Sequence, residues 1–405
     1  MTEAELMQLL AAITPPDDDA RAAAHAHWAS LAKPLGGLGA LETMLEDAAA
    51  LTGTAQFDFS RRAVAVLCAD NGVVAQGVSQ TDQSVTRAVA ENLAARRTSV
   101  CRMAQAAHCD VLPVDMGIAG APVPGVRDCR VAAGTADFTK GPAMTRAEAV
   151  DAIGRGIALT RQLAAEGYGL VATGEMGIGN TTPTSALFSA YLGLPVEETV
   201  GRGAGLSDEG LERKRDCVRR ALRRVGIELD AEREASLGDD RPVDSTQMFM
   251  PSGAPDPASK QAWQCGDDAG MAAKTRPCRA KQLLFELGGL EIATMAGMFL
   301  GAVEEQIPIV IDGAISTAAA LAASRICEEE KAVADVTLAS HVSKDGAARK
   351  ALEALGLRAI IDADMSLGEG SGAVLLIPML DAALAVYRGM GSFDDIHVDA
   401  YHRFK

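Results

Sequence analysis

Short apolar runs alternate with helical segments along most of the 405-residue chain. The runs lie at residues 63–68, 110–114, 169–173, 308–311, 336–338 and 359–361. Continuous apolar runs of this length are typical of strands that are buried on both faces of a parallel sheet. Because helical patterns fill most of the intervals, the alternation predicts an α/β fold with a doubly wound, mostly parallel sheet.

Polar side chains follow several of these runs, where each strand is expected to end. Asp70 and Asn71 follow the first run, Asp312 follows the fourth, and Ser340 and His341 follow the fifth. In an open parallel sheet the carboxyl ends of the strands share one edge, and ligands bind there. The sequence therefore places candidate binding residues along one edge of the sheet.

A glycine-rich stretch at residues 174–182 joins the third run to a predicted helix at 183–192. Free backbone N–H groups and the helix dipole favour anions at such a junction, and glycines let the backbone approach a ligand. Asn180 and Thr181 add side-chain donors, whereas Glu175 suits a hydroxyl group or a cationic ring better than a phosphate. The glycine spacing fits neither a Walker A motif nor a dinucleotide fingerprint, and a turn that serves packing alone is the alternative.

Composition restricts the class of ligand and the compartment. The net charge of −16 argues against binding to nucleic acid or to anionic membranes. The eight cysteines have no metal-site spacing and are expected to be reduced thiols. The N-terminus lacks a signal-peptide pattern, and no apolar run reaches the roughly 18 residues of a membrane span. We therefore expect a cytoplasmic protein.

Several segments depart from the simple alternation. Residues 1–55 are expected to be helical, and single helices are expected up to about residue 108 and at about 280–305. Residues 228–275 are rich in Asp, Pro, Ser and Gly and have little periodicity. They are interpreted as a long surface excursion.

The motifs together resemble one family, nicotinate-nucleotide–dimethylbenzimidazole phosphoribosyltransferase. The matching segments are residues 33–42, 69–74, 134–138 with 141–145, 174–182, 201–206, 288–292, 312–313, 340–341 and 367–373. They occur in the family's order over nearly the whole chain. One such motif is a weak indication, and this many in order are a strong one.

The resemblance implies a reaction. The ribose phosphate of nicotinate mononucleotide moves to a nitrogen of a benzimidazole-type base, nicotinate leaves, and an α-ribazole phosphate forms with inversion. This product is the lower-ligand nucleotide of cobamides such as vitamin B12. The incoming base loses a proton as it attacks, which requires a carboxylate general base. No metal or cofactor is implied.

The resemblance also assigns residues by their motifs. Glu369 would be the general base and Glu175 would orient the ribose or the substrate rings; a solvated turn residue is the alternative for Glu369. The expected ribose- and phosphate-binding residues are Gly177, Gly179, Asn180, Thr181, Gly203, Lys214, Ser340 and His341. The expected base-binding residues are Thr81, Val89, Met365 and Leu367. A solvated helix lysine remains the alternative for Lys214, and a structural histidine for His341.

Three positions depart from the family pattern and leave the accepted base open. Asn71 stands where histidine is frequent, Val89 where some members have glutamine, and Ser366 where arginine is frequent. A benzimidazole, a purine or a phenolic compound remains possible, and so does a non-catalytic or heteromeric relative. A nucleotide-dependent oxidoreductase is less favoured, because the first strand is not followed by a Gly-x-Gly-x-x-Gly turn.

For architecture, the resemblance implies two domains and a homodimer. Residues 56–374 would form a large Rossmann-like catalytic domain. Residues 1–55 and about 375–405 would form a small helical domain.

Overall fold

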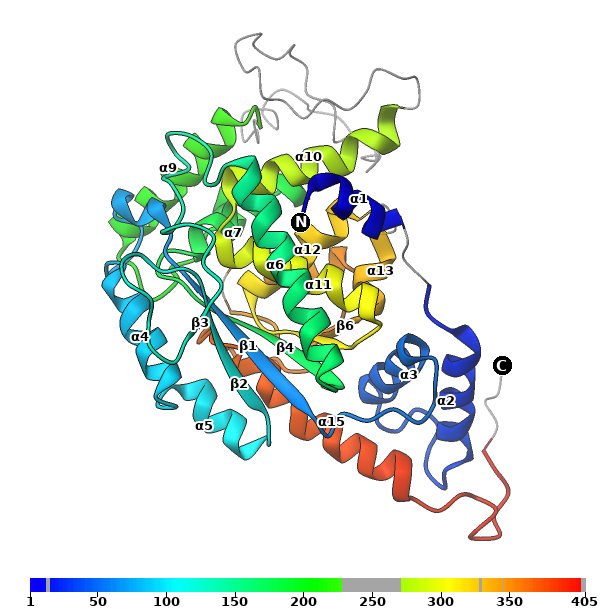
Figure 1. The fold of residues 1–405 in the computed structure, drawn as a ribbon. Helices are drawn as coiled ribbons and strands as arrows, with labels where there is room; N and C mark the ends of the chain where they lie inside the picture. Colours follow the sequence, from blue (N-terminus) through cyan, green and yellow to red (C-terminus); the bar gives the residue numbers. More distant parts are fainter. Residues whose placement is uncertain (12–14, 228–270, 328–329, 345, 402–405) are drawn as a thin grey trace.

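The computed structural model describes residues 1–11, 15–227, 271–327, 330–344 and 346–401. These residues contain one six-stranded sheet in the order β3-β2-β1-β4-β5-β6, in which every pairing is parallel (Figure 1). The strands are β1 (Arg62–Ala69), β2 (Asp110–Gly117), β3 (Arg127–Asp128), β4 (Leu170–Met176), β5 (Ile309–Ile311) and β6 (Thr337–Ala339). This order confirms the predicted doubly wound α/β fold.

Strand β1 lies at the centre of the sheet, between β2 and β4. All eight of its residues are buried. Its side chains alternate between two hydrophobic cores: Ala65 and Leu67 contribute to one core, and Val66 and Cys68 contribute to the other. A strand covered on both faces favours apolar side chains at successive positions, which explains the continuous apolar run from Ala63 to Cys68.

The helices cover the two faces of the sheet (Figure 1). The core that contains Leu67 includes side chains from α1 (Glu3–Ala11), α6 (Arg146–Ala165), α7 (Thr181–Leu192), α8 (Val196–Thr199), α9 (Asp208–Arg224), α10 (Met271–Leu287), α11 (Leu290–Glu305), α12 (Ala314–Ile326), α13 (Glu330–Asp335) and α14 (Ala348–Ala354). The core that contains Val66 includes α2 (Asp18–Ser30), α3 (Ala40–Thr52), α4 (Ser84–Ala94), α5 (Ser99–Ala106) and α15 (Ser371–Gly389). A short 3-10 helix, η1 (Gly72–Gln76), follows β1.

Local sequence signals explain several helix boundaries. The side chain of Thr145 accepts a hydrogen bond from the backbone of Glu148, whose side chain pairs with the backbone of Thr145, so the predicted capping box starts α6. Ser207 caps α9 through the backbone N–H of Gly210. The side chains of α11 are apolar and buried nearly throughout, as expected for a helix in the centre of a layer.

Two predicted single helices are each a pair of helices, so those predictions were wrong. The helix expected up to residue 108 ends with α4, because Arg96 adopts a left-handed conformation with φ of 59°. The helix expected at 280–305 is divided between α10 and α11 at the glycine pair 288–289. The excursion expected at 228–275 lies outside the described residues except for 271–275, which belong to α10.

The proposed division into two domains remains a prediction. Helices α2 and α3 pack with α15, as that division requires, but the same core continues into β1 and β4. Helix α1 contributes Leu6 and Leu10 to the other core. The two ends of the chain thus share their cores with the sheet.

Two features bear on the expectations from composition. Helix α15 is long and apolar enough on average to span a membrane, although Asp381 and Arg388 interrupt its apolar sequence. Half of that segment is buried, and it packs against α3, α5 and β4 as a core helix. Cys278 is disulfide-bonded, whereas all cysteines were expected to be reduced.

Candidate active site

A cavity of about 340 Å³ opens at the carboxyl ends of β4, β5 and β6. Glu175 and Met176 come from the end of β4, Asp312 directly follows β5, and His341 follows β6. The sheet order reverses at β1 and β4, since β2 and β3 extend to one side and β5 and β6 to the other. This reversal is where doubly wound sheets bind ligands.

The predicted residues divide into those that line the cavity and those that do not. The lining includes Val89, Glu175, Gly177, Gly179, Asn180, Thr181, Gly203, His341, Leu367 and Glu369. Lys214, Ser340, Thr81 and Met365 lie outside the lining. The hydroxyl of Ser340 donates to the backbone oxygen of Ile311 at 2.6 Å and thereby ties β6 to β5.

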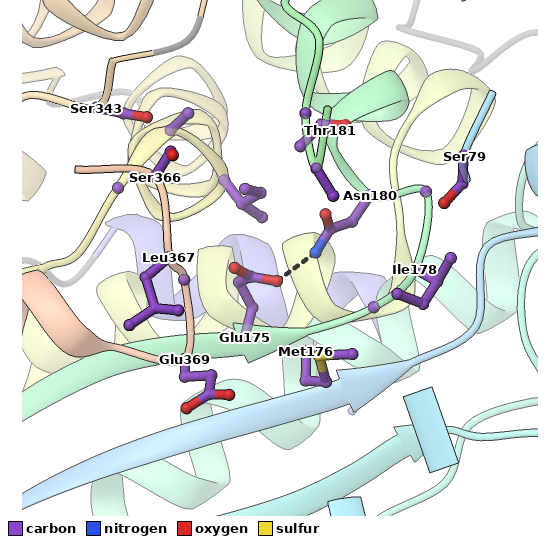
Figure 2. A pocket seen from close by; sticks show the side chains of 18 of the residues that line it. Ser79, Glu175, Met176, Ile178, Asn180, Thr181, Ser343, Ser366, Leu367 and Glu369 are labelled. Carbon is purple, nitrogen blue, oxygen red and sulfur yellow. Dashed lines mark hydrogen bonds between the residues drawn. The ribbon is translucent and has the colours of Figure 1, made fainter. Parts of the chain in front are cut away.

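Glu175 lies within β4, which continues to Met176, and not in the glycine-rich loop as expected. Glu175 is 7% exposed, and its carboxylate accepts a hydrogen bond from the side-chain amide of Asn180 (Figure 2). Burial raises the pKa of Glu175 to about 8, and the charges of Asp312 and Glu291 add to this rise. Below that pH Glu175 carries a proton and can donate it to a hydroxyl oxygen of a ligand.

The turn at residues 177–180 leads into α7, whose N-terminus has no side-chain cap. A buried cation lies directly behind it. The ammonium group of Lys214, on α9, donates to the hydroxyl of Thr181 at 2.7 Å and to the backbone oxygen of Gly201 at 3.0 Å. Lys214 is only 1% exposed, so the solvated alternative for this lysine is wrong. The helix end and the ammonium group together favour a negative charge.

A second helix N-terminus also borders the cavity. Helix α12 begins after Gly313 without a side-chain cap, and its residues Ala314, Ile315 and Ser316 line the cavity. His341 and Ser343 lie nearby in the lining. Burial lowers the pKa of His341, which is therefore neutral at neutral pH. The cavity thus offers two places where backbone N–H groups can hold an anion.

Glu369 occupies a tight loop between Gly368 and Gly370 and has a left-handed backbone with φ of 62°. Its backbone N–H donates to the backbone oxygen of Glu175 at 3.2 Å, so the loop rests on β4. Its carboxylate Oε2 accepts a hydrogen bond from the backbone N–H of Val100, in the first turn of α5, at 3.2 Å. The side chains of Glu369 and Glu175 point in different directions (Figure 2).

Asp312 holds the loop that carries Glu369. Its carboxylate accepts hydrogen bonds from the backbone N–H groups of Gly372 at 2.7 Å and of Gly370 and Ala373, each at 3.2 Å. It therefore supplies the cap that Gly370, the N-cap residue of α15, lacks. Burial raises the pKa of Asp312 to about 7, while the backbone N–H groups act in the opposite direction.

Within the described ranges, no three His, Cys, Asp or Glu side chains are arranged to hold a metal ion. Glu175 and Asp312 instead find their partners in an amide and in backbone N–H groups.

Comparisons with known proteins identify the family. The sequence model described as phosphoribosyltransferase matches residues 13–237 and 265–398. The nicotinate-nucleotide–dimethylbenzimidazole phosphoribosyltransferase of Acetivibrio thermocellus is 38% identical over 373 residues, which cover 92% of each chain. The protein of the same name from Thermus thermophilus is 37% identical over 384 residues, covering 94% of this chain and 99% of the relative. The chain belongs to this phosphoribosyltransferase family.

The fold agrees with this identification. The crystal structure of CobT from Thermus thermophilus matches with a TM-score of 0.77 and 36% sequence identity. The match covers 95% of this chain and 100% of the solved one. The chain is thus similar to CobT over nearly its whole length, and the resemblance stated from the motifs is confirmed.

Reasoning from the sequence missed part of this phosphoribosyltransferase's cavity. Met176 and Ile178 lie within the glycine-rich motif, but only the structure shows that they line the cavity (Figure 2). Arg202 and Ser343 also line it. Arg202 stands in the matching segment 201–206 and could have been found there, whereas nothing in the sequence indicates Ser343.

Replacing Gly372 by alanine is expected to lower the free energy of unfolding by about 1–3 kcal/mol, because the added carbon would be overpacked. An added Cβ would lie 1.8 Å from Nδ1 of His341, whose side chain is buried. Gly389, in the same helix, is the control, since no atom lies within 4 Å of its Cβ position. Thermal unfolding of both variants tests this; equal stability of Gly372→Ala and Gly389→Ala would contradict it.

Proposed function

We propose that the protein transfers the ribose phosphate of nicotinate mononucleotide to a benzimidazole-type base. The products are nicotinate and an α-ribazole phosphate of inverted anomeric configuration, which enters the nucleotide loop of a cobamide. The names of the relatives supply the two substrates. The observation that carries the proposal is the pair of uncapped helix N-termini, α7 and α12, in one cavity. Nicotinate mononucleotide carries two anionic groups, a phosphate and a carboxylate, that such helix ends bind.

The nucleotide would bind along the carboxyl edge of β4. One anionic group would lie at the turn 177–180, beside Gly203 and in the field of Lys214. The other would lie at the N-terminus of α12, near His341. Glu175 would then donate to a ribose hydroxyl from its protonated form. This arrangement uses the predicted ribose- and phosphate-binding residues, except that Ser340 acts through the sheet.

The incoming base would bind on the apolar side of the cavity. The apolar side chains of Val89, Met176 and Leu367 line the cavity and would form that side, and Glu369, two residues after Leu367, also lines it. Thr81 and Met365 remain predicted base-binding residues that lie outside the cavity lining. An aromatic base needs flat apolar surface together with one group that accepts its N–H proton.

The chemical step balances without a metal or an oxidant. The unprotonated ring nitrogen of the base attacks the anomeric carbon. At the same time the proton on the second ring nitrogen of the base passes to the Glu369 carboxylate. The bond between the anomeric carbon and the pyridinium nitrogen breaks, and its electron pair returns to the ring, which leaves as neutral-ring nicotinate. Val100 holds one oxygen of Glu369, so the carboxylate is fixed in position to receive the proton with the other oxygen.

The test is an incubation of purified protein with nicotinate mononucleotide and a panel of benzimidazoles, adenine and phenols. Release of nicotinate and the mass of the new nucleotide report the reaction, and the panel identifies the accepted base. If no base yields product while the nucleotide still binds, the protein is a binding or heteromeric relative. If the nucleotide does not bind, the assignment of the two helix N-termini is wrong.

The proposal includes a homodimer that works in the cytoplasm without nucleic acid or a membrane. The net charge of −16 supports the absence of nucleic acid and of anionic membranes, because it disfavours binding to polyanions. The homodimer follows from the family resemblance alone. Light scattering on the purified protein tests the dimer, and a mass corresponding to one chain would contradict it.

A further inference from the structure

A buried amide and a buried carboxyl group lie side by side beneath the cavity. Asn71 follows β1 and is 1% exposed, and Glu291 lies in the first turn of α11 and is 0% exposed. The side-chain nitrogen of Asn71 donates to Oε1 of Glu291 at 3.1 Å. Within the described part of the chain, the remaining oxygens, Oδ1 of Asn71 and Oε2 of Glu291, have no hydrogen-bond partner.

Two unpartnered buried acceptors on side chains that are hydrogen-bonded to each other lower the stability of the fold, since each loses its hydration without a replacement. One proton shared between the two oxygens would satisfy both. If Oε2 of Glu291 carries a hydrogen, it can donate to Oδ1 of Asn71, while the amide of Asn71 donates to Oε1. The two groups then form a closed acid–amide pair with two hydrogen bonds and no charge.

We propose that Glu291 is a neutral carboxylic acid in the folded protein at pH 6 and below, and that its pair with Asn71 positions the turn at 177–180. The turn lies directly against Asn71: a Cβ on Gly177 would be 3.1 Å from the side-chain nitrogen of Asn71. The same position is 3.5 Å from the side-chain nitrogen of Asn180, which in turn binds Glu175. Asn71 and Glu291 are thus positioning residues that act through the turn. Only their effect on nucleotide binding rests on the proposed function.

The surroundings favour the neutral form. Among the described residues, Asp70, Glu175 and the thiol of Cys68 interact electrostatically with Glu291, and each of these groups is either neutral or negative. Burial raises the pKa of Glu291 to about 7, against the hydrogen bonds from Asn71 and from its own helix end. The carboxylate of Asp312 differs from that of Glu291 in its hydrogen bonds. Backbone N–H groups donate to both oxygens of Asp312, and these donors require an acceptor.

The test is the stability of Glu291→Gln, whose amide mimics the neutral acid in shape and in hydrogen bonding. In the unfolded chain Glu291 ionises near its ordinary pKa of 4.5, and in the folded protein only near 7. The contribution of Glu291 to the free energy of unfolding is therefore greatest below pH 4.5. It falls as the pH rises to about 7 and is constant above pH 7. The melting temperature of Glu291→Gln should rise relative to the unmodified protein across that window and stay higher above pH 7.

A second measurement detects the proton directly. The infrared difference spectrum between the unmodified protein and Glu291→Gln at pH 6 should contain the C=O band of a neutral carboxylic acid, which disappears above about pH 8. Only carboxylate bands at pH 6 would overturn the proposal. A melting-temperature difference that does not depend on pH would overturn it too.

Glu42→Gln is the matched control. Glu42 is also buried, at 6% exposed, but its carboxylate pairs with the ammonium group of Lys33 at 2.7 Å. Its glutamine variant should melt lower than the unmodified protein at pH 7, the opposite sign to Glu291→Gln.

The positioning role has its own readout. KM for nicotinate mononucleotide should be unchanged in Glu291→Gln at pH 6 and raised at least several-fold in Glu291→Ala and Asn71→Ala. Equal KM values in Glu291→Gln and Glu291→Ala would overturn the positioning role. Because the melting and infrared measurements need no substrate, failure of the proposed function would leave them intact.

Discussion

Glu369→Gln is expected to lower kcat for transfer to the base by about 10²–10⁴-fold, the usual contribution of a general base. Glutamine keeps the size of the side chain and can still accept the backbone N–H of Val100 through its carbonyl oxygen. It cannot accept the proton that the base loses. KM for nicotinate mononucleotide is expected to change little, because the proposed arrangement uses Glu369 for the incoming base and not for the nucleotide. Steady-state kinetics with saturating base measure both constants.

Asp364→Asn is the matched control for this experiment. Asp364 is an acidic residue of the same connection, with a left-handed backbone of φ 51°, and it is exposed and lies outside the cavity lining. Its replacement is expected to leave kcat within about 2-fold. A comparable loss in both variants would mean that the loop's conformation, and not the Glu369 carboxylate, supports the reaction.

Asp312→Ala is expected to reduce both activity and stability. The substitution leaves the backbone N–H groups of residues 370, 372 and 373 without their acceptor, which should cost about 3 kcal/mol in the free energy of unfolding. It also releases the start of α15 and the loop that carries Glu369. A displacement of about 1 Å at a reacting group can lower a rate by about 10²-fold. Denaturant unfolding and kcat measure the two effects.

Asp312→Asn separates these effects if the alanine variant folds poorly. Its remaining carbonyl oxygen can accept the N–H groups of Gly372 and Ala373, which both bond to Oδ1 in the parent, while the bond from Gly370 is lost. Both losses should therefore be intermediate. The control is Asp362→Asn, an exposed carboxylate paired with Arg349, which should change stability by less than about 0.5 kcal/mol. Unchanged kcat in Asp312→Ala would contradict the positioning role.

The fold was largely predictable, because the interior segments of strands that are buried on both faces are mostly apolar. Residues 63–68 and 169–173 were both predicted as strands from this property and form the two central strands. The edges were harder to find. β3 is two residues long, and no sequence pattern of that length distinguishes a strand from a loop. The glycine pair 288–289 and the left-handed Arg96 broke two helices whose apolar periodicity continues across the break.

The sequence by itself determined the family, the parallel sheet and most residues of the cavity, because motifs at strand ends converge wherever parallel strands align. Only the tertiary structure decided how the acidic groups divide their tasks. Asp312 caps α15, Glu369 contacts the N-terminus of α5, and Glu291 pairs with Asn71. These partners are 60, 269 and 220 residues apart in the chain. The burial and the hydrogen bonds that set the protonation of a carboxyl group come from such distant segments, and no local pattern records them.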